Sequence, residues 1–196
     1  MRLPRRALAL LVATPAAAAV PDWVAELRRG GFVLYMRHGV TDRSQLDTGR
    51  LGDRAGQRNL SAAGVRLAGE VSDAIARLGI PIGLVRSSPV FRASDTAAII
   101  ARGQPVEVTM DLVADDYTAD IPAAVAGLRR ALAIAPAPGT NTLLVGHIQK
   151  LAMVLGRSVA QQEFRENGVA VFRPEPPASF ALRRILSPQD ILAAAG

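Results

Sequence analysis

Short apolar runs alternate along the chain with segments in which apolar side chains recur at helical spacing. An uninterrupted apolar run of this length is typical of a strand that is buried on both faces of a sheet. The sequence therefore predicts four strands, at residues 31–36, 82–85, 105–110 and 142–146.

The first long helix is predicted between the first two of these strands. Ser61 precedes it as an N-cap, after a polar loop over residues 41–59, and Gly79 follows its end. Its apolar side chains recur on one face, as expected of a helix that packs against a sheet. That face consists of Leu67, Val71, Ala74, Ile75 and Leu78.

The other helices have similar start signals. One is predicted within residues 88–103, with Ser88 as the N-cap and Pro89 at the first helical position. Asp120 opens another, which runs to about Ala135. A further helix, residues 148–155, follows the fourth strand.

Two further strand patterns, 168–174 and 179–186, flank a Pro-rich turn and predict a hairpin near the end of the chain. Alternation of strands with helices is the pattern of an α/β fold. We therefore expect a three-layer α/β/α sandwich around a mostly parallel sheet. The pattern indicates one domain, residues 20–196, with no repeat and no linker.

The first 19 residues have the order of features that a secretory signal peptide needs. A basic start, MRLPRR, precedes the apolar stretch ALALLVA and then small residues that offer Ala17-Ala18-Ala19 as a cleavage site before Val20. The apolar stretch is too short for a transmembrane helix. We expect residues 1–19 to be removed and the protein to be periplasmic or secreted, with no membrane anchor after cleavage. Arg5-Arg6 alone does not identify the export route.

Composition narrows the classes of partner. Cleavage would remove three arginines and no acid, so the formal net charge falls from +6 to +3. The chain has no dense basic run interleaved with aromatic side chains, so we expect no nucleic-acid partner. With no cysteine, it has neither disulfides nor thiolate metal sites. The oligomeric state is not predictable from the sequence.

Polar groups follow three of the predicted strands, where ligands bind in parallel α/β sheets. The first strand ends in Arg37-His38-Gly39, the second is followed by Arg92 within the next helix, and the fourth ends in Gly146-His147. Both histidines of the protein therefore stand at strand ends, each beside a glycine. Arginine binds phosphate oxygens bidentately and stays charged.

This set of residues suits a phosphoryl group. Helix N-termini after Ser88 and His147 would add backbone N–H donors. A neutral imidazole nitrogen can attack phosphorus and carry the group as phosphohistidine. Neighbouring arginines lower the pKa of His38 and keep that lone pair available. Such chemistry needs no metal and no cofactor.

The motifs RHG after the first strand, SSPVFRASDTA in mid-chain and LLVGH late in the chain resemble those of the histidine phosphatase superfamily, which includes phosphoglycerate mutases and small phosphatases. The resemblance spans roughly Phe32 to Phe172 and implies the phosphoglycerate mutase-like fold. It implies that His38 is the phosphorylated nucleophile and that Arg37 and Arg92 clamp the phosphate. His147 would hydrogen-bond the transferring oxygens.

Three positions depart from the common motifs of this family. Ser44 stands where many relatives have asparagine, and Ile148 follows the second histidine where glycine is frequent. The general acid is often a glutamate after the third strand, but the segment MDLVADDYTAD offers only aspartates. Asp115 is the first candidate for this acid and Asp116 the second; a solvated acidic loop is the other interpretation. Residues 57–59 could also line the pocket.

These observations favour an exported phosphomonoesterase that acts on a small phosphorylated substrate. The first alternative is a non-catalytic phosphate- or polyanion-binding module, which the missing glutamate would suit. The second is a phosphomutase, which the short loops disfavour, because mutases of this family cap the pocket with long insertions. The sequence does not identify the substrate.

Overall fold

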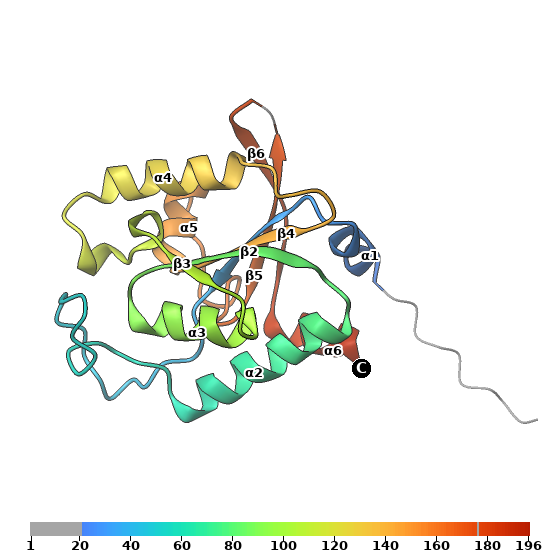
Figure 1. The fold of residues 1–196 in the computed structure, drawn as a ribbon. Coiled ribbons are helices and arrows are strands. Elements are labelled where there is room, and N and C mark those ends of the chain that lie inside the picture. Colours follow the sequence, from blue (N-terminus) through green and yellow to red (C-terminus); the bar gives the residue numbers. More distant parts are fainter. Residues whose placement is uncertain (1–20, 176) are drawn as a thin grey trace, which may run out of the picture.

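The computed structural model describes residues 21–175 and 177–196. One six-stranded sheet runs through the protein in the order β3-β2-β4-β1-β5-β6 (Figure 1). Strands β3, β2, β4 and β1 run parallel to one another. Strands β5 and β6 form an antiparallel hairpin, and β5 pairs with β1. The strands are β1 (Val33–Arg37), β2 (Ile82–Ser87), β3 (Val106–Val108), β4 (Asn141–Gly146), β5 (Val169–Glu175) and β6 (Ser179–Leu186).

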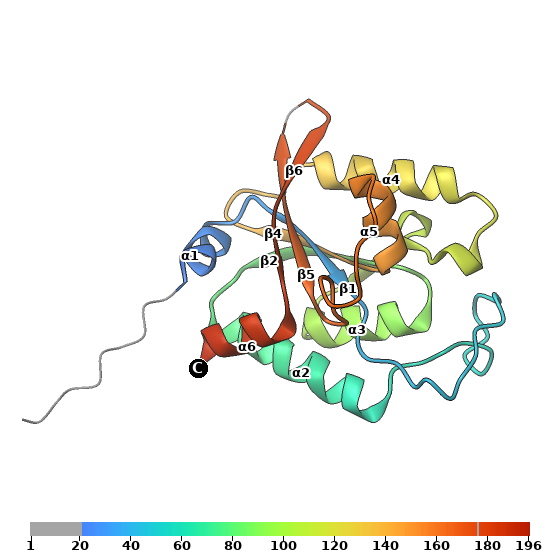
Figure 2. The ribbon, with the colours of Figure 1, turned by 180° about the vertical axis from the view of Figure 1, so that it is seen from behind.

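Helices cover both faces of this sheet. On one face lie α1 (Asp22–Arg29), α2 (Ala62–Arg77), α3 (Phe91–Ala101) and α6 (Pro188–Ala195), and on the other lie α4 (Ile121–Ala133) and α5 (Ile148–Leu155) (Figures 1 and 2). Two short 3-10 turns, Met110–Leu112 and Asp115–Tyr117, follow β3. The prediction of a three-layer sandwich around a mostly parallel sheet is therefore confirmed.

The pleat of β1 divides the core between the two faces. Leu34 and Met36 pack towards α1, α2 and α3, whereas Val33 and Tyr35 pack towards α4 and α5. All five residues of β1 are buried, as the uninterrupted apolar run predicts. Burial on both faces fixes this strand, and the fixed strand in turn fixes the residues that follow it.

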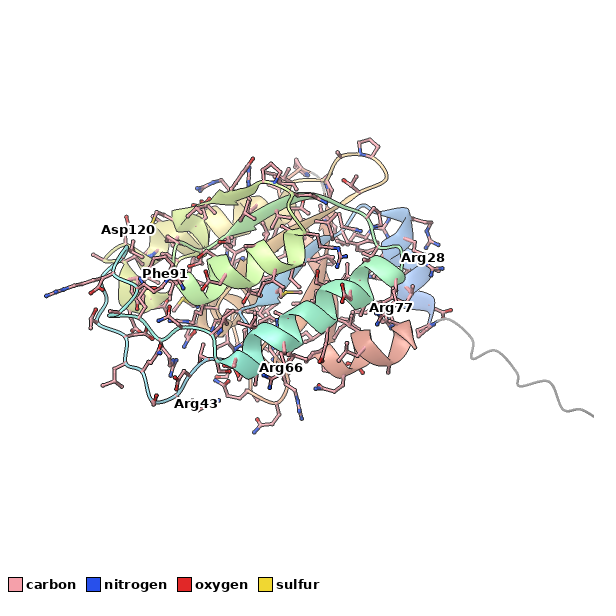
Figure 3. All side chains as sticks on the ribbon, turned by 60° about the horizontal axis from the view of Figure 1, so that its bottom comes forward. Arg28, Arg43, Arg66, Arg77, Phe91 and Asp120 are labelled. Carbon is pink, nitrogen blue, oxygen red and sulfur yellow. The ribbon has the colours of Figure 1, made fainter. Side chains whose placement is uncertain are left out.

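Helix α2 begins as the sequence predicts. The Ser61 hydroxyl accepts a hydrogen bond from the backbone N–H of Gly64, and the expected apolar face is turned to the core. At Gly64 the helix contacts the backbone carbonyl of Val40, and a Cβ at this position would collide with that carbonyl. Figure 3 shows the helix running past Arg66 and Arg77, with Arg43 in the loop that precedes it. This contact holds the loop after β1 against the helix.

The start of α3 differs from the prediction. The helix begins at Phe91, and Ser88 does not cap it, because strand β2 continues to Ser87 and residues 88–90 connect the two elements. Arg92 is therefore the second residue of α3, whereas a helix that starts at Pro89 would have it as the fourth. Helices α1 and α6 were not predicted from the sequence.

The predicted signal peptide, residues 1–19, and the predicted first mature residue, Val20, lie outside the described residues. Within residues 21–175 and 177–196, no helix combines the length and the apolar character needed to cross a bilayer.

Candidate active site

A cavity of about 570 Å³ lies at the carboxyl ends of the parallel strands. Every site residue predicted from the sequence contributes to its wall, and so does the second acid candidate. These residues are Arg37, His38, Arg92, Asp115, Asp116 and His147. The structure therefore brings together residues that are up to 110 positions apart in the chain.

His38 follows β1 directly and is held in place by its backbone and its ring. Its N–H donates to the carbonyl of Gly146 on β4 at 3.0 Å, and its side chain is almost wholly buried. Nδ1 lies 2.8 Å from the carbonyl oxygen of Gly39. Because a carbonyl oxygen can only accept, Nδ1 carries the proton, and the lone pair is left on Nε2.

Gly39 allows the segment after β1 to pack closely against α3. Its N–H donates to Thr96 Oγ1 at 2.9 Å, and the Thr96 hydroxyl donates to the carbonyl of Arg92 at 2.7 Å. A Cβ at position 39 would lie 3.2 Å from Asn167 Oδ1 and 3.3 Å from Thr96 Oγ1. A side chain at position 39 would therefore lengthen or break the hydrogen bonds that connect the His38 segment to α3.

His147 lies between β4 and α5, as the N-cap of α5, and faces His38, with the two ring centroids 5.3 Å apart. Its Nε2 lies 3.0 Å from the hydroxyl of Ser88. Tyr35 holds its backbone from the other face of the sheet: the phenol donates to the carbonyl of His147 at 2.8 Å and accepts from its N–H at 2.9 Å. The second histidine is thus fixed by residues from β1 and from the segment after β2.

Arg37 and Arg92 are buried beside the histidines and keep donors that are not used. Nη1 of Arg37 donates to the carbonyl of Phe164 at 2.8 Å, and Nη1 of Arg92 donates to Asp47 at 2.9 Å. The Nε atom of each arginine is buried and has no hydrogen-bond partner among the described residues. An unsatisfied buried donor on a guanidinium is suited to an oxyanion ligand.

Both histidines are neutral in this environment. Burial, with a smaller effect of the charges of Arg92 and Arg37, lowers the pKa of His38 to about 3. Burial also holds the pKa of His147 well below its usual value, followed by the effects of His38 and Arg92. A neutral His38 ring has the lone pair that nucleophilic attack needs.

The acid candidates lie on the 3-10 turn after β3. Asp116 is exposed, whereas Asp115 is half-buried, and its Oδ1 accepts a hydrogen bond from Lys150 Nζ at 2.6 Å. The segment therefore reaches the cavity, as the sequence analysis expects. The partner of Asp115, a fully buried lysine on α5, was not predicted.

The helix N-termini differ in what they offer. At the start of α3, the N–H of Phe91 donates to Gln57 Oε1 and the N–H of Val90 donates to Ser88 Oγ, so the donors expected there after Ser88 are used within the protein. At the start of α5, Ile148 and Gln149 follow His147 directly and line the cavity. The N-terminus of α5 therefore lies at the cavity.

Asp47 is the main functional residue that sequence analysis missed. Its carboxylate contacts Nη1 of Arg92 and accepts a hydrogen bond from the Tyr117 hydroxyl at 2.6 Å. Burial opposes ionisation, but the hydrogen bonds from Tyr117 and from the backbone of Arg58, with the charge of Arg92, lower its pKa below the usual value. Asp47 stands in a loop with several acids and arginines, and nothing in the sequence distinguishes it.

Two more arginines add positive charge to the wall of the cavity. Arg58, one of the loop residues considered in the sequence analysis, lines the cavity with Arg43 near its rim. Arg43 lies 3.9 Å from Glu166, which shares this rim. In the described part of the chain, no group of three or more histidine, aspartate or glutamate side chains is arranged to hold a metal ion.

Comparison with known proteins gives a family and a fold. The family model of the histidine phosphatase superfamily (branch 1) matches residues 33–114, which include Arg37, His38 and Arg92. No curated protein matches the chain in sequence. The family match bears out, over residues 33–114, the resemblance that the motifs show, and the structural matches below share the fold.

Three solved structures illustrate the shared fold. The protein histidine phosphatase SixA, complexed with tungstate, has a TM-score of 0.61 at 17% identity, over 82% of this chain and 99% of that one. The alpha-ribazole phosphatase from Shigella flexneri has a TM-score of 0.57 at 17% identity, over 80% and 96%. A phosphoserine phosphatase variant from Entamoeba histolytica, in complex with phosphoserine, has a TM-score of 0.53 at 16% identity, over 81% and 98%.

Proposed function

We propose that this chain, which matches the histidine phosphatase superfamily over residues 33–114, is a member of that superfamily and a phosphatase that hydrolyses a phosphate monoester through a phosphohistidine at His38. The observation that carries the proposal is the geometry of that ring. Nδ1 is committed to the Gly39 carbonyl, and the free Nε2 belongs to a cavity lined by buried arginines. Names of structural relatives, such as protein histidine phosphatase and phosphoserine phosphatase, support the same reaction class.

The geometry suits a two-step transfer. In the first step Nε2 of His38 attacks phosphorus, and the leaving oxygen departs with a proton from an acid of the cavity. Arg37, Arg92 and His147 stabilise the charge on the transferring oxygens. In the second step water attacks the phosphohistidine, which releases inorganic phosphate and the free imidazole. The roles of these residues remain predictions of this proposal.

A small phosphorylated substrate fits a cavity of about 570 Å³. The loop 41–59 and the segment 113–120 lack the long insertions with which mutases of this family cap the pocket, so we expect water to reach the cavity for the second step. This feature favours hydrolysis over mutase activity.

The test is to trap the covalent intermediate. With p-nitrophenyl phosphate, wild-type protein should form an acid-labile, base-stable phosphoenzyme at His38, and His38→Ala should form none and lose turnover. His38→Asn is the matched control for folding, because its amide can keep a hydrogen bond to the Gly39 carbonyl. Wild-type activity in either variant would contradict the mechanism.

A second arm separates the enzyme from its alternatives. Activity that persists after treatment with a chelator supports a metal-independent phosphatase, whereas lost activity contradicts metal independence. Phosphate binding without any hydrolysis would favour a non-catalytic binding module instead.

We also propose that the protein is exported and acts in the periplasm or outside the cell. The support is the order of charge, apolar stretch and small residues over positions 1–19. Mass spectrometry of protein from the cell envelope should find a mature N-terminus at or near Val20. Intact Met1 in cytoplasmic protein would contradict export.

A further inference from the structure

The single lysine of the chain is buried at the back of the proposed active site. Lys150 lies on the core-facing side of α5, among Ile148, Leu151 and Val154, and its side chain has no exposed surface. An ammonium group in such a place is costly unless it is paired. An aliphatic side chain would fill the same position without that cost, so packing alone does not explain the lysine.

The partner of Lys150 connects it to the cavity. Nζ donates to Asp115 Oδ1 at 2.6 Å, and the Asp115 side chain, which is 20% exposed, lines the cavity. Lys150 itself does not reach solvent. Among the described residues, Asp115 is its one hydrogen-bond partner, so a proton on Nζ has a path to the cavity through this carboxylate.

Other titratable groups lie around the pair. Tyr35 on β1 and His147 after β4 lie beside it in the core; the Tyr35 hydroxyl donates to the backbone carbonyl of His147, and the His147 ring contacts the Ser88 hydroxyl. Across the cavity stand Arg92 on α3 and the exposed Asp116 next to Asp115. Arginine does not release its proton, and the Tyr35 hydroxyl already donates its proton to the backbone of His147.

We propose that Lys150 and Asp115 form a proton relay for the phosphatase reaction. The inference rests on the proposed function and adds a residue to it. Asp115 is the group that faces the substrate. Lys150 donates a proton to Asp115 in the first step and receives one from it in the second. Because Lys150 acts through Asp115, it is a positioning and relay residue rather than one that touches the substrate.

The protons balance over the two steps. When Nε2 of His38 forms its bond to phosphorus, the bond from phosphorus to the leaving oxygen breaks, and the Asp115 carboxylate passes a proton from Lys150 Nζ to that oxygen. After this transfer Asp115 is again a carboxylate, and Lys150 is a neutral amine. When water attacks, the N–P bond breaks and an O–P bond forms. One proton of the water passes to Asp115 and on to Lys150, so both groups return to their first state.

The segment that holds Asp115 has other anchors, which argues against a purely structural ion pair. The neighbouring Tyr117 is buried, its hydroxyl donates to Asp47 at 2.6 Å, and its N–H donates to the carbonyl of Ala114. These contacts fix the turn without Lys150. The turn therefore does not need the ion pair to hold it in place, and the pair can transfer a proton during the reaction.

The experiment measures the phosphorylation step with two leaving groups, by rapid quench and detection of phosphohistidine. An alkyl phosphate such as glycerol 2-phosphate needs the acid, and p-nitrophenyl phosphate does not. General acid catalysis typically contributes ~10²–10⁴-fold, so Lys150→Met and Asp115→Asn should each slow the alkyl substrate by at least about tenfold. The aryl substrate should change less than about threefold, and the double variant should be no slower than either single variant.

Lys150→Arg separates a relay from an ion pair. Arginine keeps the charge and the contact but does not release its proton. A relay predicts that this variant is slow on the alkyl substrate, whereas an ion pair alone predicts near-wild-type rates on both. Arg102→Gln, which breaks an exposed ion pair with Asp73 between α3 and α2, is the control with unchanged rates.

The outcomes distinguish the two proposals. Selective loss on the alkyl substrate in the lysine variants supports the relay, and equal loss on both substrates or recovery in Lys150→Arg overturns it. If the single lysine variants fail to fold, Asp115→Asn/Lys150→Met, a neutral pair, gives the same selective or equal loss. Wild-type protein that forms no phosphohistidine with either substrate contradicts the proposed function itself.

Discussion

At the scale of single residues, the site depends on the shape of the arginine side chain as well as on its charge. Arg37 and Arg92 each use Nη1 within the protein and leave a buried Nε without a partner among the described residues. A planar guanidinium group whose Nη1 is held by a hydrogen bond presents its other N–H donors in a fixed direction. Lysine has the charge but not this geometry.

We therefore expect Arg37→Lys and Arg92→Lys to lose far more activity than conservation of charge suggests. Loss of one preorganised donor typically costs ~10²–10³ in rate. The measurement is kcat/KM on p-nitrophenyl phosphate for each variant. A loss below about threefold would show that the arginine does not bind the phosphate.

Asp47 acts on the same site through Arg92. The carboxylate accepts hydrogen bonds from Nη1 of Arg92 and from the Tyr117 hydroxyl, so it fixes the position of the Arg92 guanidinium through Nη1. Asp47→Asn keeps an oxygen for these donors but removes the charge. Because small displacements of a positioned group lower rates strongly, we expect kcat/KM to fall by roughly tenfold.

The control for this variant is Asp95→Asn, which weakens a more exposed ion pair with Arg54 at 2.7 Å. It should change kcat/KM by less than about twofold, as expected of a surface pair. An increase in activity for Asp47→Asn would show instead that Asp47 competes with phosphate for Arg92.

At the scale of elements, hydrophobic patterning predicted most of the sheet and the central helices. Helix α5 was predicted at residues 148–155 and has these bounds, because the apolar run of β4 and Gly156 delimit it. The start of α3 was wrong, since Ser88 has the residue type of an N-cap but contacts His147 instead. Tertiary contacts of this kind have no signature in local sequence.

Helix α6 was missed although its signal is in the sequence. Ser187 and Asp190 form a capping box, and Pro188 stands at the first turn. Helix α1 has the weaker pattern Trp23, Val24 and Leu27 on its buried side. Capping signals near the ends of the chain would thus have found at least one of the two helices.

The contact between β1 and β4 gives a prediction at this scale. A Cβ on Gly146 would meet the Tyr35 hydroxyl and lie 3.0 Å from its Cζ. Gly146→Ala should push the phenol away from the backbone of His147, with a loss of about 1–3 kcal/mol in the free energy of unfolding, as in other overpacked cores. Urea unfolding measures the stability, and kcat on p-nitrophenyl phosphate should fall as well.

Tyr35→Phe is the matched comparison, because it removes the same hydrogen bonds without a steric collision. It should destabilise the protein by ~1–3 kcal/mol, since the N–H and C=O of His147 lose their partner. Unchanged stability in Gly146→Ala would show that the sheet accommodates the methyl group and that the tyrosine is not held by this contact.

At the scale of the whole molecule, the candidate site is assembled from both faces of the sandwich. His38 follows a central strand, Arg92 comes from a helix on one face, and Lys150 comes from a helix on the other. The carboxyl edge of parallel strands predicts that the histidines and arginines converge. It does not predict Asp47 or Lys150, because their pairing depends on how separate elements pack.

Burial of two neutral histidines links the fold to pH. The unfolded chain binds a proton at each histidine near pH 6.5, whereas the pKa of His38 in the folded protein is about 3 and that of His147 is also low. Below pH 6.5 the unfolded state therefore binds more protons than the folded state, and the free energy of unfolding falls as the pH falls. The contribution is complete above pH 6.5 and is lost progressively towards pH 3.

We expect His38→Asn to flatten this dependence. One histidine contributes about 1.4 kcal/mol per pH unit within the window, so between pH 6.5 and pH 4.5 the wild-type protein should lose roughly 2–3 kcal/mol more than the variant. Urea unfolding in phosphate-free buffer at several pH values measures the difference, since bound phosphate would stabilise the folded state by itself. Parallel pH profiles for the two proteins would mean that His38 takes up a proton at the same pH in the folded protein as in the unfolded chain, which would contradict the lowered pKa on which its neutral state in mildly acidic solution depends.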